Sequence, residues 1–456
     1  MQKNRFRLPV KHYPGAPIRT TGSAAPWRDD ITGDHPEIAA MLYRNYYLFL
    51  VSIGLSFMAL AFAFNSPAAI WQGMLKILFS PANLLTDYIQ LANPGATLFN
   101  VGLMTLFTIS NIRLNKLPVS GSIIAGIFTM IGFSFFGKNL YNTLPIILGV
   151  FLYAKLVGQP FGEYVLHSMF GTALSPLVSA FSFSLGFPLP LGVALGIVSG
   201  LFVGLIIVPL SLRFLQFHKG YSLYNIGFTA GIIGMFFMAV LRGFGMEVPV
   251  VSILSQGRNL PFALMLTAIF LWIFLIGLRV NHWKLKGYSR LFGMPGVLPT
   301  DFLAQRGFGI TLINMAVLGM LSIGYVLVMG GELNGPVIGG IFTVVGFGAY
   351  GKHLKNVVPI VVGVTIANFL NIHETTASFT IIAALFGTTL APIAGRYGTV
   401  AGIIAGFLHM SLVTNVGFLH AGMNLYNNGF SGGFVAALLV PLMDTLDQLR
   451  IARKRS

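Results

Sequence analysis

Long apolar runs, separated by short polar or glycine-rich stretches, make up most of the chain. A helix needs about 20 apolar residues to cross a bilayer, and fourteen runs approach that length. In the first half these predicted helices lie at about 45–65, 96–112, 121–136, 143–157, 162–183, 191–211 and 222–241. In the second half they lie at about 261–280, 309–329, 335–350, 357–372, 376–394, 397–417 and 424–443.

Two of these runs, 121–136 and 335–350, are short and broken by glycines. A segment of this kind can enter a membrane and stop inside it, provided that protein or water surrounds its free ends. We therefore expect half-helices at these two places.

The two halves of the chain repeat each other. With an offset of 214 residues, GSIIAGIFTMIGFSFFGKNLYNTLPIILGV (121–150) and GPVIGGIFTVVGFGAYGKHLKNVVPIVVGV (335–364) are identical at 16 of 30 positions. Two later blocks also repeat, FGTALSP (170–176) with FGTTLAP (386–392) and HKGYSLYNIGFTAG (218–231) with HAGMNLYNNGFSGG (420–433). Apolar composition alone does not produce such identity, so the chain contains a duplicated domain.

The repeat divides the chain. We predict a first copy at 42–242, a connector at 243–255 and a second copy at 256–446. A polar, basic tail at 1–41 precedes the first copy, and a short basic tail at 447–456 follows the second. The first tail has no apolar core, so we do not interpret it as a cleaved secretory signal.

Lys and Arg are distributed in opposite ways over the loops of the two copies. Loops 113–118 and 212–221 carry them in the first copy, whereas their counterparts in the second carry none. Loop 281–306 of the second copy carries four, and its counterpart 67–92 carries only Lys76. Cytoplasmic loops are enriched in Lys and Arg. The reversal predicts that the copies insert upside-down relative to each other, with both termini in the cytoplasm of a bacterium.

Composition agrees with a membrane protein. Hydrophobic residues make up 55% of the 456 residues and charged residues only 9%, against about 25% charged in soluble domains. The net charge of +16 comes from residues scattered over tails and loops, without a nucleic-acid-binding motif, so we expect no nucleic-acid partner. The absence of cysteine excludes disulfides, iron–sulfur clusters and thiol catalysis.

Inverted repeats are a recurring plan of transporters, whose substrate site lies between the repeats beside broken helices. Polar residues at matching positions are the candidates for lining such a path, because hydroxyl and amide groups both donate and accept hydrogen bonds. They are Thr129, Thr343, Thr172, Thr388, Tyr224, Tyr426, Asn225 and Asn427. The alternative is structural: a Thr bonds its own helix and an Asn caps one.

Charged residues at matching positions have two interpretations each. Asp87 and Asp301 precede apolar helices, so they are N-terminal caps at the membrane interface or sites for a cation or proton. Lys138 and Lys352 either reach the interface with their ammonium groups or attract an anionic substrate.

Other ionisable residues lack a partner in the other copy or the neighbours that a site needs. Residues in or near apolar runs are functional candidates by default; here they are Glu163, His167, His373 and Glu374. His218 and His420 match each other, but nothing nearby supplies further metal ligands. No metalloprotease, hydrolase or phosphate-binding motif is present. We expect neither metal nor cofactor, and no enzymatic activity.

The duplicated pattern GxxxxGIFTxxGFxxxGKxLxN, followed by FGTxLxP and LYNxGFxxG, resembles an uncharacterised family of duplicated multi-pass bacterial membrane proteins, a domain of unknown function. More distantly, the chain resembles urea transporters, which have two inverted halves. Asn334-Gly335-Pro336 and Leu425-Tyr426-Asn427 occupy places comparable to the two blocks that open helices in that family. The first copy departs from the pattern with Ser120-Gly121-Ser122, and the filter segment of the urea family is not found.

Together these observations predict an all-α inner-membrane protein with two inverted repeats of about five to seven segments each. Its expected function is that of a channel or carrier for a small polar solute. The alternatives are an ion- or proton-coupled secondary transporter, an intramembrane enzyme acting on a lipid, and a membrane scaffold. The oligomeric state, including a homo-oligomer, stays open.

Overall fold

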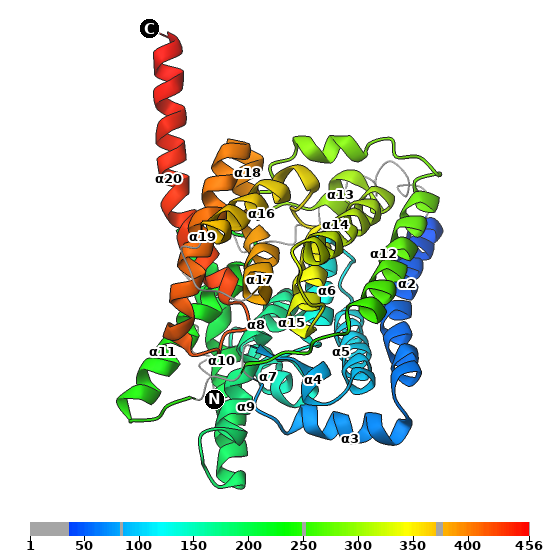
Figure 1. Ribbon diagram of the computed structural model, residues 1–456, viewed down its shortest axis with the longest axis vertical. Helices are drawn as coiled ribbons and strands as arrows, with labels where there is room; N and C mark the ends of the chain where they lie inside the picture. Colours follow the sequence, from blue (N-terminus) through cyan, green and yellow to red (C-terminus); the bar gives the residue numbers. More distant parts are fainter. Residues whose placement is uncertain (1–35, 83–84, 249–251, 371–376, 456) are drawn as a thin grey trace, which may run out of the picture.

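The computed structural model describes residues 36–82, 85–248, 252–370 and 377–455, and these form a bundle made almost entirely of helices (Figure 1). The first copy contains α2 Pro36–Phe64, α3 Pro67–Leu78, β1 Leu85–Thr86, α4 Tyr88–Leu91, α5 Pro94–Leu114, α6 Gly121–Phe133, α7 Leu140–Leu156, η1 Phe161–Tyr164, α8 Val165–Gly171, η2 Thr172–Leu174, α9 Ser175–Phe183, α10 Leu189–His218 and α11 Asn225–Gly243.

The rest of the chain has a similar order of helices from α12 on, but its short strand precedes α12 and the 3-10 helix η3 stands in place of α3. It contains β2 Ser252–Ile253, α12 Asn259–Val280, η3 Tyr288–Gly293, α13 Phe302–Arg306, α14 Phe308–Val328, α15 Gly335–Phe347, α16 Leu354–Phe369, α17 Ala377–Gly387, η4 Thr388–Leu390, α18 Ala391–Tyr397, α19 Thr399–His420 and α20 Asn427–Arg455.

Each of the fourteen predicted runs coincides with a helix or a pair of consecutive helices. Within the described part of the chain, ten helical segments are long and apolar enough to cross a membrane. The four shorter apolar helices are α6, α7, α15 and α16. Large apolar side chains such as Val198, Phe236 and Leu264 are 61%, 64% and 63% exposed. A soluble protein would not present so many of them to water, so this is a multi-span helical membrane protein.

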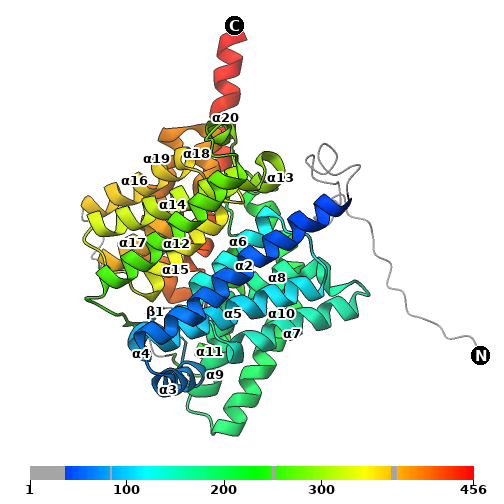
Figure 2. The same ribbon diagram turned by 90° about the vertical axis from the view of Figure 1, so that its right-hand side faces the viewer.

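One stretch predicted as a loop is structured. Residues 67–92 contain α3 and α4, and α3 lies across one end of the bundle (Figure 1). Ser66 caps α3 and Pro67 occupies its first position, which is a favourable start for a helix. The counterpart region after α12, with η3 and α13, lies at the opposite end of the bundle (Figures 1 and 2).

The helices α6 and α15 are too short to cross a bilayer. Each has 13 residues, which is about 20 Å at 1.5 Å per residue, against a hydrocarbon core of about 30 Å. Ser120 caps the first helix through the amide of Ile123, and Asn334 caps the second through the amide of Val337. Both helices are buried among others, as the expectation of half-helices requires.

At the other end of each short helix, the side-chain amide of a buried asparagine donates hydrogen bonds to free carbonyl oxygens. The Asn100 side chain donates to the carbonyl oxygens of Ser134 and Lys138 at 2.8 and 3.0 Å. In the second copy the Asn314 side chain donates to those of Gly348 and Lys352, both at 2.7 Å. Carbonyl groups freed at a helix end must be satisfied by protein when no water is at hand. The two asparagines therefore allow these helices to stop inside the bundle.

The short helices of the two copies pack directly against each other. Gly121 at the start of α6 adjoins Ala349, just beyond the end of α15, and Gly335 at the start of α15 adjoins Phe135. The two helices therefore run antiparallel. A Cβ atom on Gly132 would lie 2.6 Å from the carbonyl oxygen of Gly339, so the backbones touch where only glycine fits.

Two further pairs of equivalent helices meet in the same way. Helices α2 and α12 run antiparallel, with the Phe49 and Trp272 rings 5.3 Å apart and the Phe64 and Phe262 rings 5.9 Å apart. The first turns of α11 and α20 meet where Gly227 adjoins Gly429. Equivalent helices thus face one another along one line through the molecule.

Each copy also contributes a carboxylate to the short helix of the other. Asp301 accepts a hydrogen bond from the amide of Gly121 at 2.9 Å, and Asp87 accepts one from the amide of Gly335. The short strands β1 and β2 pair in parallel and bring Ser255 to Asp87, to which its amide and hydroxyl donate at 2.9 and 2.6 Å.

The predicted capping role is confirmed, because Asp87 and Asp301 accept from the backbone amides of Ile89 and Ala304. The predicted position of Asp87 at a solvated interface is wrong. Its side chain is fully buried, and its hydrogen bonds also join the two copies.

We expect Asp87→Asn to lower the free energy of unfolding by about 3 kcal/mol, because the new amide group would face the donors of Ser255. Asp301 is partly exposed, so Asp301→Asn should cost about 1 kcal/mol, the typical value for a weakened cap. Thermal unfolding of the purified protein in detergent measures both. The exposed Glu247 supplies the control, Glu247→Gln. Equal losses for all three variants would contradict this account.

Candidate functional site

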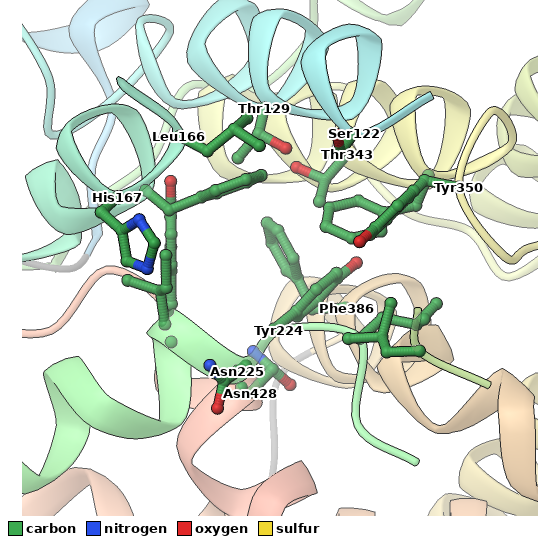
Figure 3. Close-up of a pocket in the computed structure, with 18 of the residues that line it drawn as sticks. Ser122, Thr129, Leu166, His167, Tyr224, Asn225, Thr343, Tyr350, Phe386 and Asn428 are labelled. Atoms are coloured by element: carbon green, nitrogen blue, oxygen red, sulfur yellow. The ribbon is translucent and has the colours of Figure 1, made fainter. Parts of the chain in front are cut away.

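A cavity of about 150 Å³ lies where the two copies meet, between the short helices and the first turns of α11 and α20 (Figure 3). Much of its lining consists of residues at equivalent positions in the two copies. These pairs are Thr129 with Thr343, Phe133 with Phe347, Phe170 with Phe386, Tyr224 with Tyr426 and Gly227 with Gly429. The cavity therefore lies on the line along which equivalent helices face one another.

At one end the cavity extends beyond this paired lining. Ser122, Pro299 and Tyr350 line it there, whereas Pro336 and Phe136, the equivalents of Ser122 and Tyr350, do not. This end is near the start of α6 and the segment before α13. The cavity thus reaches toward one end of the bundle, on the side of loop 281–306.

Thr129 and Thr343 point into the cavity from adjacent helices (Figure 3). Each hydroxyl donates to its own helix, to the carbonyl oxygens of Ala125 at 2.7 Å and Gly339 at 2.8 Å. The structural interpretation is therefore confirmed for both threonines, and both also line the cavity; a role in a substrate path stays a prediction. Because the hydroxyl protons are engaged, the oxygens present acceptor sites to the cavity.

Lys138 and Lys352 lie behind the tyrosines of the cavity wall. Both side chains are fully buried, so the predicted reach toward the interface is wrong. Lys138 Nζ donates to the hydroxyl of Tyr426 at 2.6 Å, and Lys352 Nζ donates to that of Tyr224 at 2.5 Å. Each pair joins one copy to the other.

Aromatic rings surround the two ammonium groups. Lys138 Nζ lies 4.7 Å from the ring centre of Tyr426 and 5.2 Å from that of Phe133. The distances for Lys352 are 4.6 Å to Tyr224 and 5.2 Å to Phe347. Aromatic faces attract cations, more strongly when both are desolvated. All four rings also line the cavity.

Thr172 and Thr388 lie in the short 3-10 turns η2 and η4, which interrupt their helices. Thr388 accepts from Lys352 Nζ at 2.7 Å. Thr172 instead lies 3.5 Å from the sulfur of Met130, which is also 3.5 Å from Lys138 Nζ. Neither threonine lines this cavity; they contact the lysines or their neighbours.

The asparagines divide between two roles. Asn225 lines the cavity, but Asn427 does not, and its neighbour Asn428 takes that place. The oxygens of Asn225 and Asn427 lie 3.0 and 2.8 Å from the Nε2 atoms of His218 and His420. These matching histidines therefore fix the starts of α11 and α20.

Of the unmatched ionisable candidates, His167 lines the cavity. Its Nδ1 atom is buried and has no hydrogen-bond partner among the described residues. Glu163 is exposed on η1, whereas His373 and Glu374 lie outside the described residues. Over the described ranges no three His, Asp or Glu residues gather in a way that could hold a metal ion.

Sequence reasoning missed the aromatic part of the site, namely Phe133, Phe347 and Tyr350. The first two lie within the longest repeated block, at equivalent positions, so their pairing was a usable signal. Tyr350 has Phe136 as its equivalent, so no repeated polar residue indicated a role for it. Apolar side chains in an apolar helix do not reveal from sequence alone which of them face a cavity.

The family described as "Protein of unknown function (DUF1576)" matches the chain twice, at residues 66–243 and 280–445. The chain therefore belongs to this family and contains its domain in duplicate, which confirms the repeat and the resemblance to an uncharacterised duplicated family. No curated protein and no solved structure matches it. The distant resemblance to urea transporters thus stays a prediction.

We expect Tyr426→Phe to lower the free energy of unfolding by about 2 kcal/mol, because the buried ammonium group of Lys138 loses its oxygen acceptor. Combining it with Lys138→Met should recover part of this loss, since no buried charge is then left without a partner. Tyr141→Phe, which removes the neutral hydrogen bond to Ser182, is the matched control at about 1 kcal/mol. Thermal unfolding of the wild type, the single variants Tyr426→Phe and Lys138→Met, and the double variant gives the coupling; strictly additive effects would show that the pair does not interact.

Proposed function

We propose that this member of the family is a channel or transporter that moves a small polar solute across the bacterial cytoplasmic membrane. The observation that carries the proposal is a cavity inside a multi-span bundle, lined by equivalent residues of both copies. Substrate sites of transporters lie in this position when the fold is built from repeats.

The proposal includes an inverted arrangement of the two copies. Three observations support it: α6 runs antiparallel to α15, α2 runs antiparallel to α12, and the counterpart regions 67–92 and 281–306 lie at opposite ends of the bundle. The reversed Lys and Arg distribution over the loops points the same way.

The size and lining of the cavity suit a small solute. A cavity of about 150 Å³ engineered into another protein accepts benzene, so a solute of roughly six non-hydrogen atoms fits. Hydroxyls of Thr129, Thr343 and the tyrosines, with the amides of Asn225 and Asn428, offer both donors and acceptors. Phenylalanine rings between them limit the solute to one with little bound water.

Uncoupled passage is favoured over coupling to a proton or cation. Coupling through Asp87 or Asp301 requires a carboxylate that the path can reach, but both accept hydrogen bonds from the short helices and neither lines the cavity. Their position suits a structural role.

Reporter fusions test the inverted arrangement. We expect fusions near residues 115 and 290 to report the cytoplasm and those near 80 and 330 to report the outside, because the charged loops determine orientation. If residues 115 and 330 report the same side, the copies are not inverted and the proposed path between them is lost.

Uptake into liposomes tests transport. Urea, formamide, ammonium and simple anions are supplied outside, and the protein should speed the entry of at least one over protein-free liposomes. Thr343→Phe should lower that rate by about tenfold or more, since a phenyl group fills much of a cavity of about 150 Å³. Thr399→Phe, at an exposed position, is the control and should keep the rate. If all probes enter as slowly as without protein, or if Thr343→Phe has no effect, the proposal fails.

A further inference from the structure

Two buried lysines beside the cavity have no anionic partner among the described residues. Lys138 and Lys352 are each 0% exposed, and all their contacts are with neutral groups: hydroxyls, one thioether sulfur and aromatic rings. Among the described residues the one salt bridge joins Arg450 and Asp447 on α20. Burying a cation without an anion is strongly unfavourable, so an anionic ligand beside these lysines would stabilise their charged form.

The two tyrosines place hydroxyl groups, each bonded to a lysine, at the wall of the cavity. The oxygens of Tyr426 and Tyr224 accept hydrogen bonds from the ammonium groups, so each tyrosine retains its own O–H to donate elsewhere. The Tyr224 hydroxyl also lies within hydrogen-bonding reach of Thr388, whereas among the described residues no hydrogen bond donated by the Tyr426 hydroxyl is found. A hydroxyl whose oxygen accepts from a cation is polarised into a better donor. Two such donors, one from each copy, line the same cavity.

The rest of the lining selects against cations and against large or doubly charged anions. No carboxylate lines the cavity in the described part of the chain, whereas Asn225, Asn428 and His167 add groups able to donate. The four phenylalanine rings, at 133, 347, 170 and 386, cannot replace the tightly held water of a divalent ion. The available volume restricts the anion to a few non-hydrogen atoms.

We infer that the solute is a small monovalent anion of the size of formate or nitrate, bound by the hydroxyls of Tyr224 and Tyr426 with Lys352 and Lys138 behind them. This inference rests on the proposed transport path and names the class of solute that it takes. The charge of each lysine acts over a short distance in a medium of low dielectric constant, where it is weakly screened.

Formate and formamide form a matched pair of probes, because they have the same number of non-hydrogen atoms and differ in charge. Uptake of each into liposomes is measured for the full chain, with the membrane potential clamped by a potassium ionophore. Formate should enter faster than formamide by about tenfold or more. In Lys138→Met/Lys352→Met the ratio of the two rates should fall by about tenfold. The exposed Lys155 provides the control, and Lys155→Met should keep the ratio.

A binding measurement on the wild type requires no variant. Formate or nitrate at increasing concentration should raise the unfolding temperature of the purified protein in detergent, whereas formamide should not. Formamide uptake that equals or exceeds formate uptake, without stabilisation by formate, would overturn the anion inference and leave transport standing. Stabilisation by formate without uptake of either probe would support the anion site and contradict transport.

Discussion

The structure depends on a contact between two backbones that leaves no room for side chains. Helices α6 and α15 touch at Gly132 and Gly339, where a Cβ atom on either would overlap the backbone of the other helix. Neither helix is long enough to cross the membrane, so every freed amide and carbonyl at their ends must find a partner within the protein. The asparagines at 100 and 314 and the aspartates at 87 and 301 supply many of these partners.

This constraint explains why the polar residues of the interior fall into two sets. One set holds the ends of helices, as Asn100 does for α6 and as His218 does through Asn225. The other set faces the cavity, as the two threonines and two tyrosines do. Lys138 and Lys352 connect the sets, because their carbonyl oxygens help to end the short helices while their ammonium groups contact the cavity wall.

Apolar runs and the repeat offset were sufficient to predict the fourteen apolar helical segments, including the short helices α6 and α15. They were not sufficient to predict contacts between the copies. Lys138 and Tyr426 are 288 residues apart, and nothing in either sequence neighbourhood indicates the other. The burial of Asp87 was missed for the same reason, since Ser255 and Gly335 belong to distant segments. Asn428 was missed because its equivalent in the first copy is the apolar Ile226, which also lines the cavity, so the repeat gave no polar pair at this position.

The reciprocal bonds of Asp87 with Gly335 and of Asp301 with Gly121 have a consequence for the symmetry of the molecule. Each copy contains both an aspartate and a short helix. The aspartate of one copy nevertheless bonds the first residue of the short helix in the other copy. Two identical single-copy chains facing each other would satisfy both bonds, so the two copies contact each other as the subunits of a symmetric dimer do. Two copies within one chain can differ in sequence: Asn334 stands where the first copy has Ser120, and Tyr350 where it has Phe136. Such divergence between duplicated copies can give the two ends of one cavity different properties, which a dimer of identical subunits cannot do.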